Sequence, residues 1–118
     1  YIGEKTYTEF GNALCLSIGL GGEDLAEKIT QGKALKATLA AAAYVYDALL
    51  SFGKKYEDYV INEIDENYKK MLDAGATSFW ETVEGVEDGD LSCSLCHGWS
   101  ALPIYYYALT GRIKFSKE

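Results

Sequence analysis

The chain has 118 residues, enough for one domain, and 48% of them are apolar, which argues against a disordered chain. Its 18 acidic and 11 basic side chains give a net charge of −7, which makes nucleic acid and anionic membrane surfaces poor partners. The longest apolar run, residues 39–46, is far shorter than the ~20 residues of a membrane-spanning helix.

The start of the chain and its cysteines bear on where the protein acts. The chain opens YIGEKTYTEF, without an initiator Met and without the basic-then-apolar layout of a signal peptide. We therefore expect a processed product or a piece of a larger protein. Three cysteines, an odd number, do not form a disulfide framework, and reduced thiols favour a cytoplasmic location. A secreted or periplasmic location of a longer parent stays open.

Helical patterns fill the first half of the chain. A first helix is predicted from Thr8 to Leu20, where glycines follow. Residues 22–35 begin with acidic side chains, which the helix dipole favours, and form a second predicted helix. The alanine-rich residues 35–53 form a third, and its low charge predicts burial on most faces.

The clearest predicted helix covers residues 54–75 and ends at Gly75. Its charged residues face water, and its apolar residues form one stripe: Tyr56, Val60, Ile64, Met71 and Leu72. A last helix is predicted from Trp99 to Leu109, and its three consecutive tyrosines, 105–107, cannot all face one way. The sequence therefore predicts an all-α fold with four to five helices.

A long loop, residues 76–96, separates the last two predicted helices. Loops beyond about 12–15 residues in compact domains are usually functional or disordered. Phe79 and Trp80 argue against disorder, so we expect a functional loop.

One hypothesis for this loop is covalent haem. Cys93, Cys96 and His97, the only histidine, have the CxxCH spacing by which c-type haem is attached. On this hypothesis the chain is a small helical haem protein, and Met71 is the only methionine available as an axial ligand. Zinc on the same three residues would lack a fourth protein ligand, except a carboxylate or Cys15.

A second hypothesis uses the whole segment. Residues 75–82, GATSFWET, and residues 94–101, SLCHGWSA, with Pro103 beyond, resemble the end of the catalytic domain of bacterial α-L-rhamnosidases. These glycoside hydrolases form an (α/α)6 toroid and are also called six-hairpin glycosidases. They carry a GAT-x-x-WE segment, and one subgroup has an SLCHGWSA-like segment after it. The resemblance spans most of residues 6–111 and implies a carbohydrate substrate, no cofactor and no metal.

The resemblance places the family's general base at Glu81. Inverting glycosidases pair a carboxylic acid that protonates the leaving oxygen with a carboxylate that activates water, about 6.5–9.5 Å away. Glu81 lies between Trp80 and Thr82, where aromatic side chains can desolvate it and tune its pKa. The alternative is that Glu81 is one of several surface acids of this loop, which also include Glu84, Glu87, Asp88 and Asp90.

Five further residues are candidates for substrate binding. The resemblance implies that His97, with Trp99 beside it, faces the sugar, while the alternative for His97 is a structural or capping residue. Phe79 and Trp80 are either an apolar platform for the sugar or part of the core. Asp47, within an otherwise apolar helix, is either a buried acid or a pocket residue.

The resemblance also implies that half of the site is missing. A twelve-helix toroid needs several hundred residues, and nothing in residues 1–74 resembles the upstream segment that carries the family's general acid. We therefore expect the C-terminal part of a catalytic domain, inactive alone, with residues 112–118 as the possible start of a following β-domain. Helices separated from a closed toroid leave apolar flanks uncovered. We expect self-association through such flanks, namely Val60, Ile64, Met71 and residues 39–43.

Overall fold

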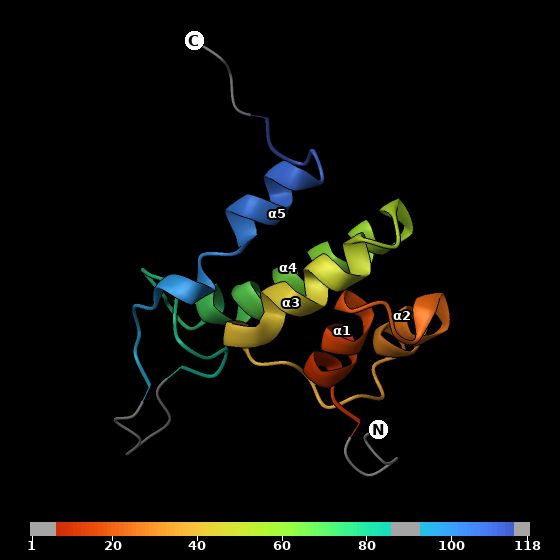
Figure 1. Cartoon of the computed structure of the whole chain (residues 1–118). Helices are drawn as coiled ribbons and strands as arrows, with labels where there is room; N and C mark the ends of the chain where they lie inside the picture. Colours follow the sequence, from red (N-terminus) through yellow and green to blue (C-terminus); the bar gives the residue numbers. More distant parts are fainter. Residues whose placement is uncertain (1–6, 86–92, 115–118) are drawn as a thin grey trace. The chain divides into compact units, whose positions relative to one another are not determined.

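The computed structural model describes residues 7–85 and 93–114 (Figure 1). Five α-helices and two 3-10 turns form the regular structure of these residues, with no strand among them, so the all-α prediction is confirmed. No helix in these two ranges has both the length and the apolar character needed to cross a bilayer. The chain divides into two compact units, Tyr1–Val60 and Ile61–Glu118.

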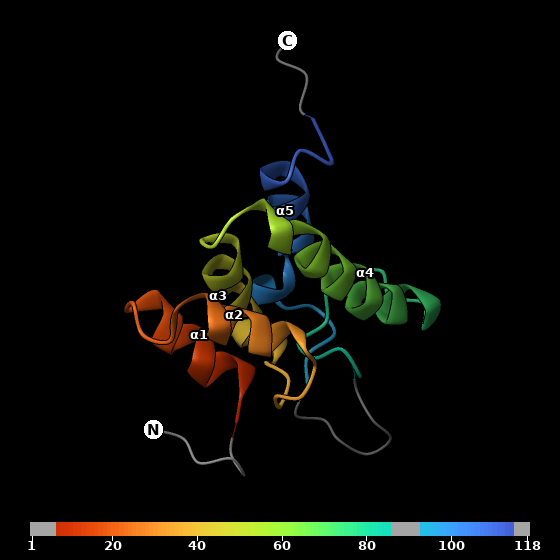
Figure 2. The ribbon, with the colours of Figure 1, turned by 90° about the vertical axis from the view of Figure 1, so that its right-hand side faces the viewer.

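The first unit contains α1 (Glu9–Ser17), α2 (Gly22–Thr30) and α3 (Leu39–Leu50). Helix α1 packs against both α2 and α3, and Figures 1 and 2 show the three helices side by side. Small and aliphatic side chains fill the space between them: Ala13, Leu16, Ala26, Ile29, Ala42, Val45 and Leu49. Burial of this apolar surface is the main stabilisation of the first unit.

Helix α1 is shorter than predicted. It starts where expected, because the Thr8 hydroxyl accepts a hydrogen bond from the Gly11 N–H at 3.0 Å and caps the helix. It ends at Ser17 because Gly19, with φ of 80°, turns the chain and the Leu20 N–H bonds back to the Cys15 carbonyl at 2.8 Å. The predicted end at Leu20 is therefore wrong, and Leu20 is exposed.

Helix α3 starts later than predicted. The Leu35 N–H donates to the Tyr7 carbonyl at 2.9 Å, and the Leu35 carbonyl accepts from the Glu9 N–H at 3.0 Å. The buried Glu9 carboxylate also accepts from the Ala37 N–H at 3.0 Å and lies 3.2 Å from the Lys36 ammonium. These bonds hold the chain extended before α3, so a helix cannot begin at Leu35.

A 3-10 turn, η2 (Lys54–Tyr56), leads into α4 (Glu57–Asp73). The Lys55 ammonium lies 2.5 Å from the Glu23 carboxylate and 3.2 Å from that of Glu27, both on α2. The hydrogen bond to Glu23 is the largest cause of a raised pKa at Lys55. These ion pairs are exposed, so they contribute little to stability.

The apolar stripe of α4 is confirmed except at its end. Tyr56, Val60, Ile64 and Met71 are buried, whereas Leu72 is 69% exposed because the next helical position points about 100° away. The same burial shows that Val60, Ile64 and Met71 are covered within the chain. They are therefore not exposed apolar residues through which the chain could self-associate, contrary to our expectation.

The second unit contains most of α4, a 3-10 turn η3 (Gly98–Ser100) and α5 (Pro103–Leu109). The predicted start of the last helix at Trp99 is wrong: proline at the first helical position marks the start of α5. The tyrosines diverge as predicted, since Tyr105 is exposed, Tyr106 is buried, and the Tyr107 hydroxyl donates to Asp65 of α4. Residues 115–118 of the predicted β-domain start lie outside the described residues.

Candidate functional site

Two stretches of the predicted loop lie side by side in the second unit (Figure 2). The Glu81 N–H donates to the Ser94 carbonyl at 2.8 Å, and the His97 N–H donates to the Phe79 carbonyl at 2.7 Å. Because the residue numbers of the bonded partners run in opposite directions, the two segments form a short antiparallel pair. The pairing brings together the two sequence segments from which the site was predicted.

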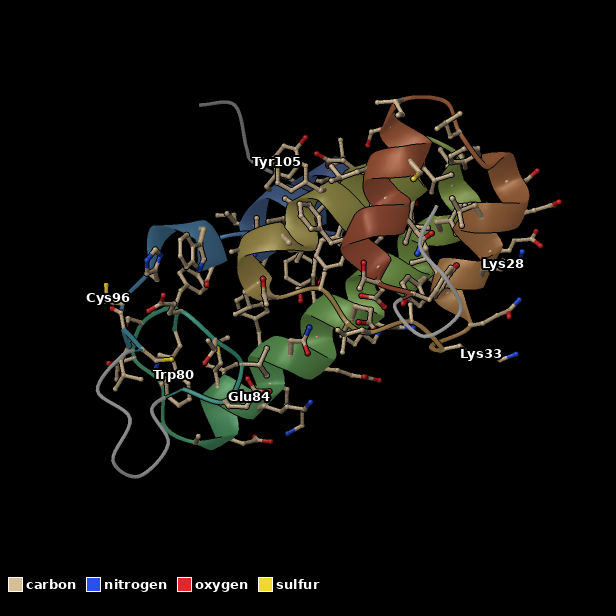
Figure 3. All side chains as sticks on the ribbon, turned by 60° about the horizontal axis from the view of Figure 1, so that its bottom comes forward. Lys28, Lys33, Trp80, Glu84, Cys96 and Tyr105 are labelled. Carbon is tan, nitrogen blue, oxygen red and sulfur yellow. The ribbon has the colours of Figure 1, made fainter. Side chains whose placement is uncertain are left out.

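Glu81 is held at both its backbone and its side chain. One carboxylate oxygen, Oε2, accepts a hydrogen bond from the Ser94 N–H at 2.7 Å. The Glu81 carbonyl accepts from the Trp99 indole N–H at 3.3 Å. Glu81 is half-buried, whereas Glu84 is exposed at the edge of the same loop (Figure 3). The other acids of the surface-cluster alternative, Glu87, Asp88 and Asp90, lie outside the described residues.

His97 and Trp99 form a stacked pair. Their ring centroids are 3.6 Å apart with an interplanar angle of 26°. His97 lies at the start of η3 but its side chain makes no capping bond. Its Nδ1 atom is buried and has no hydrogen-bond partner among the described residues. Buried polar atoms are nearly always paired, so within the described ranges Nδ1 lacks the partner that such an atom ordinarily has.

Ser100 connects this loop to α4 and was missed by the sequence analysis. It is fully buried, its hydroxyl donates to the Trp80 carbonyl, and its own carbonyl accepts from the Tyr68 hydroxyl. Burial raises the pKa of Tyr68 to about 12, so this hydroxyl stays a donor at neutral pH. The signal in the sequence was slight, since a serine beside Trp99 has no pattern that predicts burial.

Trp80 packs against the turn that follows it. In that turn the Gly85 N–H donates to the Thr82 carbonyl at 3.3 Å, and the Thr82 hydroxyl donates to the Gly85 carbonyl at 3.2 Å. A Cβ on Gly85 would lie 2.6 Å from the Trp80 ring, and φ of 70° already favours glycine. One part of the Trp80 ring is therefore covered by backbone.

Phe79 lies in the wall of a pocket of about 360 Å³ beside this site. Its ring meets Tyr68 edge-to-face, with centroids 5.9 Å apart, and is 42% exposed. The pocket is lined by Tyr68, Met71, Leu72, Ala76, Thr77, Ser78, Phe79, Pro103 and Tyr107. Of the predicted site residues only Phe79 lines it, and the sequence analysis did not anticipate it.

The hydrogen bonds that join Glu81 to Ser94 and Trp99 involve neither a cysteine thiol nor the Asp47 carboxylate. Cys93 is half-buried and Cys96 is exposed, and both are free thiols; Figure 3 shows Cys96. Across residues 7–85 and 93–114, no three His, Cys, Asp or Glu side chains come close enough to hold a metal ion. Asp47 belongs to the first unit and is exposed on α3, so the buried-acid alternative is wrong. Its role in a pocket stays a prediction.

Comparison with known proteins found no relative: no protein-family model, no curated protein and no solved structure matches the chain. Any reaction of this chain is therefore inferred from the candidate site. The site consists of a carboxylate held through one oxygen, an aromatic pair beside it, and a buried ring nitrogen that lacks a partner among the described residues.

Proposed function

We propose that this chain carries the general-base half of an inverting glycoside hydrolase site, that of an α-L-rhamnosidase-like (α/α)6 toroid, with Glu81 as the base. The proposal rests first on the resemblance of residues 75–82 and 94–101 to that family. The observation that supports it further is the pairing of these two segments: the Trp99 indole donates to the Glu81 carbonyl, and His97 stacks on Trp99.

The bonds at Glu81 suit a general base. The Ser94 N–H holds Oε2, which fixes the carboxylate plane, and Oε1 then takes the proton of the attacking water. A fixed orientation matters because a general base must lie within hydrogen-bond reach of the proton that it removes. An exposed acid such as Glu84 has no such constraint.

The neighbouring side chains suit a sugar. His97 Nδ1 offers a hydrogen bond to a hydroxyl, and the exposed faces of Trp99 and Phe79 offer apolar surface to the C–H groups of the ring. Trp80 contributes less surface, because Gly85 covers part of its ring. In this proposal the general acid comes from outside the chain, so the chain alone has no hydrolase activity.

The test is Glu81→Gln in the intact parent enzyme with an aryl rhamnoside as substrate. The amide is nearly isosteric, so substrate binding persists while kcat falls roughly 10²–10⁴-fold or more. Glu84→Gln is the matched control and should keep near-normal kcat. His97→Ala should weaken kcat and substrate binding together. Near-normal turnover of Glu81→Gln, or loss of turnover in Glu84→Gln, would contradict the assignment.

The covalent-haem alternative is decided separately. Haem attached at Cys93 and Cys96 would give an intense Soret band that survives denaturation and a matching increase in mass. The proposed hydrolase fragment is colourless and has the mass of its sequence.

Self-association is the other part of the proposal. Large apolar side chains are exposed in both units, among them Ile18, Leu20, Ile104 and Leu109. Such side chains gain by being covered. Light scattering should therefore show a mass that rises with protein concentration, and a monodisperse monomer at all concentrations would contradict this part.

A further inference from the structure

The pocket beside Phe79 has aromatic walls from three parts of the second unit. Tyr68 comes from α4, Phe79 from the loop and Tyr107 from α5, and the thioether of Met71 and the ring of Pro103 complete the walls. Thioethers and aromatic rings make favourable contacts with a further aromatic ring. The volume of about 360 Å³ is ample, since an apolar cavity of about 150 Å³ binds benzene.

None of the lining residues is an Asp, Glu, Lys, Arg or His. The two lining tyrosines, Tyr68 and Tyr107, are neutral at physiological pH. Burial raises the pKa of Tyr68 to about 12, and the hydrogen bond to Asp65 raises the pKa of Tyr107 to about 12. A charged ligand would therefore find no counter-charge on the walls, and a neutral one is favoured.

Three lining hydroxyls have already used their hydrogens. The Tyr68 hydroxyl donates to the Ser100 carbonyl, Ser78 donates to the Leu95 carbonyl, and Tyr107 donates to the Asp65 carboxylate. Each oxygen keeps lone pairs, so these hydroxyls can still accept a hydrogen bond. A ligand that complements these three hydroxyls must itself bring the donor, whereas the Thr77 hydroxyl can either donate or accept.

We propose that this pocket binds a neutral aromatic molecule of one or two rings that carries an O–H or N–H donor, such as a phenol or an indole. The aromatic walls hold the ring, and the oxygen of Ser78 or Tyr107 accepts the donor. This proposal stands without the hydrolase proposal, because none of its steps uses Glu81 or a sugar.

The experiment is a titration of the purified chain with phenol and with anisole, followed by NMR. Anisole has the same ring but its oxygen carries no hydrogen. Phenol should bind with a Kd on the order of 1 mM, as small ligands do, and should shift the signals of Tyr68, Met71, Phe79 and Tyr107. Anisole should bind at least about fivefold more weakly, the value of one hydrogen bond.

Two matched pairs of variants locate the site. Leu72→Ala removes part of the wall and should weaken phenol binding about fivefold, whereas Leu109→Ala, equally on the surface but outside the pocket, should leave it unchanged. Whichever hydroxyl is the acceptor, its removal by Tyr107→Phe or by Ser78→Ala should reduce phenol binding to the level of anisole. Tyr105→Phe, outside the pocket, should leave phenol binding unchanged.

Three results would overturn the proposal. The first is saturable shifts elsewhere in the chain with none in the pocket. The second is equal affinity for phenol and anisole, which would remove the acceptor argument. The third is a change of the pocket signals with protein concentration alone, which would mean that a side chain of a second copy fills the pocket.

Discussion

The first unit and the loop of the second unit are ordered by different forces. In the first unit, apolar side chains such as Ala13, Leu16 and Leu49 are almost completely buried between helices. In the described part of the loop, residues 76–85 and 93–100, the only buried residues are Gly85 and Ser100. The loop is instead held by hydrogen bonds to backbone groups and by ring contacts. The candidate chemistry thus lies where apolar packing is weakest, and the loop should open at lower free energy than the helices.

The largest effect is expected in the core of the first unit. Leu49→Ala removes a fully buried side chain and should lower the free energy of unfolding by about 2–5 kcal/mol. Urea unfolding followed by far-UV circular dichroism measures it. Leu14→Ala, at a 42% exposed position on α1, is the control and should have a much smaller effect. Equal effects would mean that the first unit is not stabilised by this core.

A pH effect in the second unit should come next. The pKa of Tyr68 is raised from its ordinary value of 10 to about 12, chiefly by burial, so folding favours the neutral phenol. This contribution is fully present below pH 10 and is lost as the pH rises from 10 towards 12, at most about 2–3 kcal/mol. Unfolding free energies measured across that range should fall. In Tyr68→Phe the fall should be shallower, and an identical slope would contradict the prediction.

A smaller and more local effect is expected at Ser100. Ser100→Ala leaves the part-buried Trp80 carbonyl without its donor, which costs about 1–3 kcal/mol. Hydrogen exchange at the amides of Glu81 and His97 should speed up, because the two paired segments lose the bond between Ser100 and Trp80 that joins them. Ser78→Ala, which removes an exposed hydrogen bond, should change these rates little. Unchanged exchange in Ser100→Ala would show that the remaining hydrogen bonds and ring contacts are enough to order the loop.

The smallest effect is expected at the ion pairs of the first unit. Lys55→Ala removes exposed contacts to Glu23 and Glu27 and should cost less than about 1 kcal/mol. Raising the salt concentration should shrink the difference from the unsubstituted chain, since salt screens exposed pairs. A larger cost that salt does not alter would mean that the aliphatic stem of Lys55 stabilises the unit by packing.

The sequence predicted what local periodicity decides. The buried positions Val60, Ile64 and Met71 of α4 follow the helical repeat, and the structure confirms them. The predicted start of α3 was wrong because the backbone bonds of Leu35 with Tyr7 and Glu9, distant in sequence, keep the chain extended. Helix propensity near Leu35 contains no information about such a partner.

The chemistry of the candidate site stays a prediction, and only the pairing of its two segments can be compared with the structure. The residues around Glu81 could be chosen from two short sequence segments, and the structure brings those segments together. Ser100 and the pocket beside Phe79 were missed because their contacts join positions far apart: Tyr68 and Ser100 are 32 residues apart, and Asp65 and Tyr107 are 42 apart. No local pattern marks such pairs.

The placement of Trp80 against Gly85, and of Trp99 against His97, has a spectroscopic consequence. These are the only two tryptophans of the chain, and both lie between residues 76 and 100. The large aromatic residues of the first unit are all tyrosines or phenylalanines. Fluorescence excited selectively in indole therefore reports on the loop and is silent about the helices of the first unit. If the indole fluorescence changes before the helical circular dichroism signal is lost, the loop and the helices unfold in two separate transitions of the same sample.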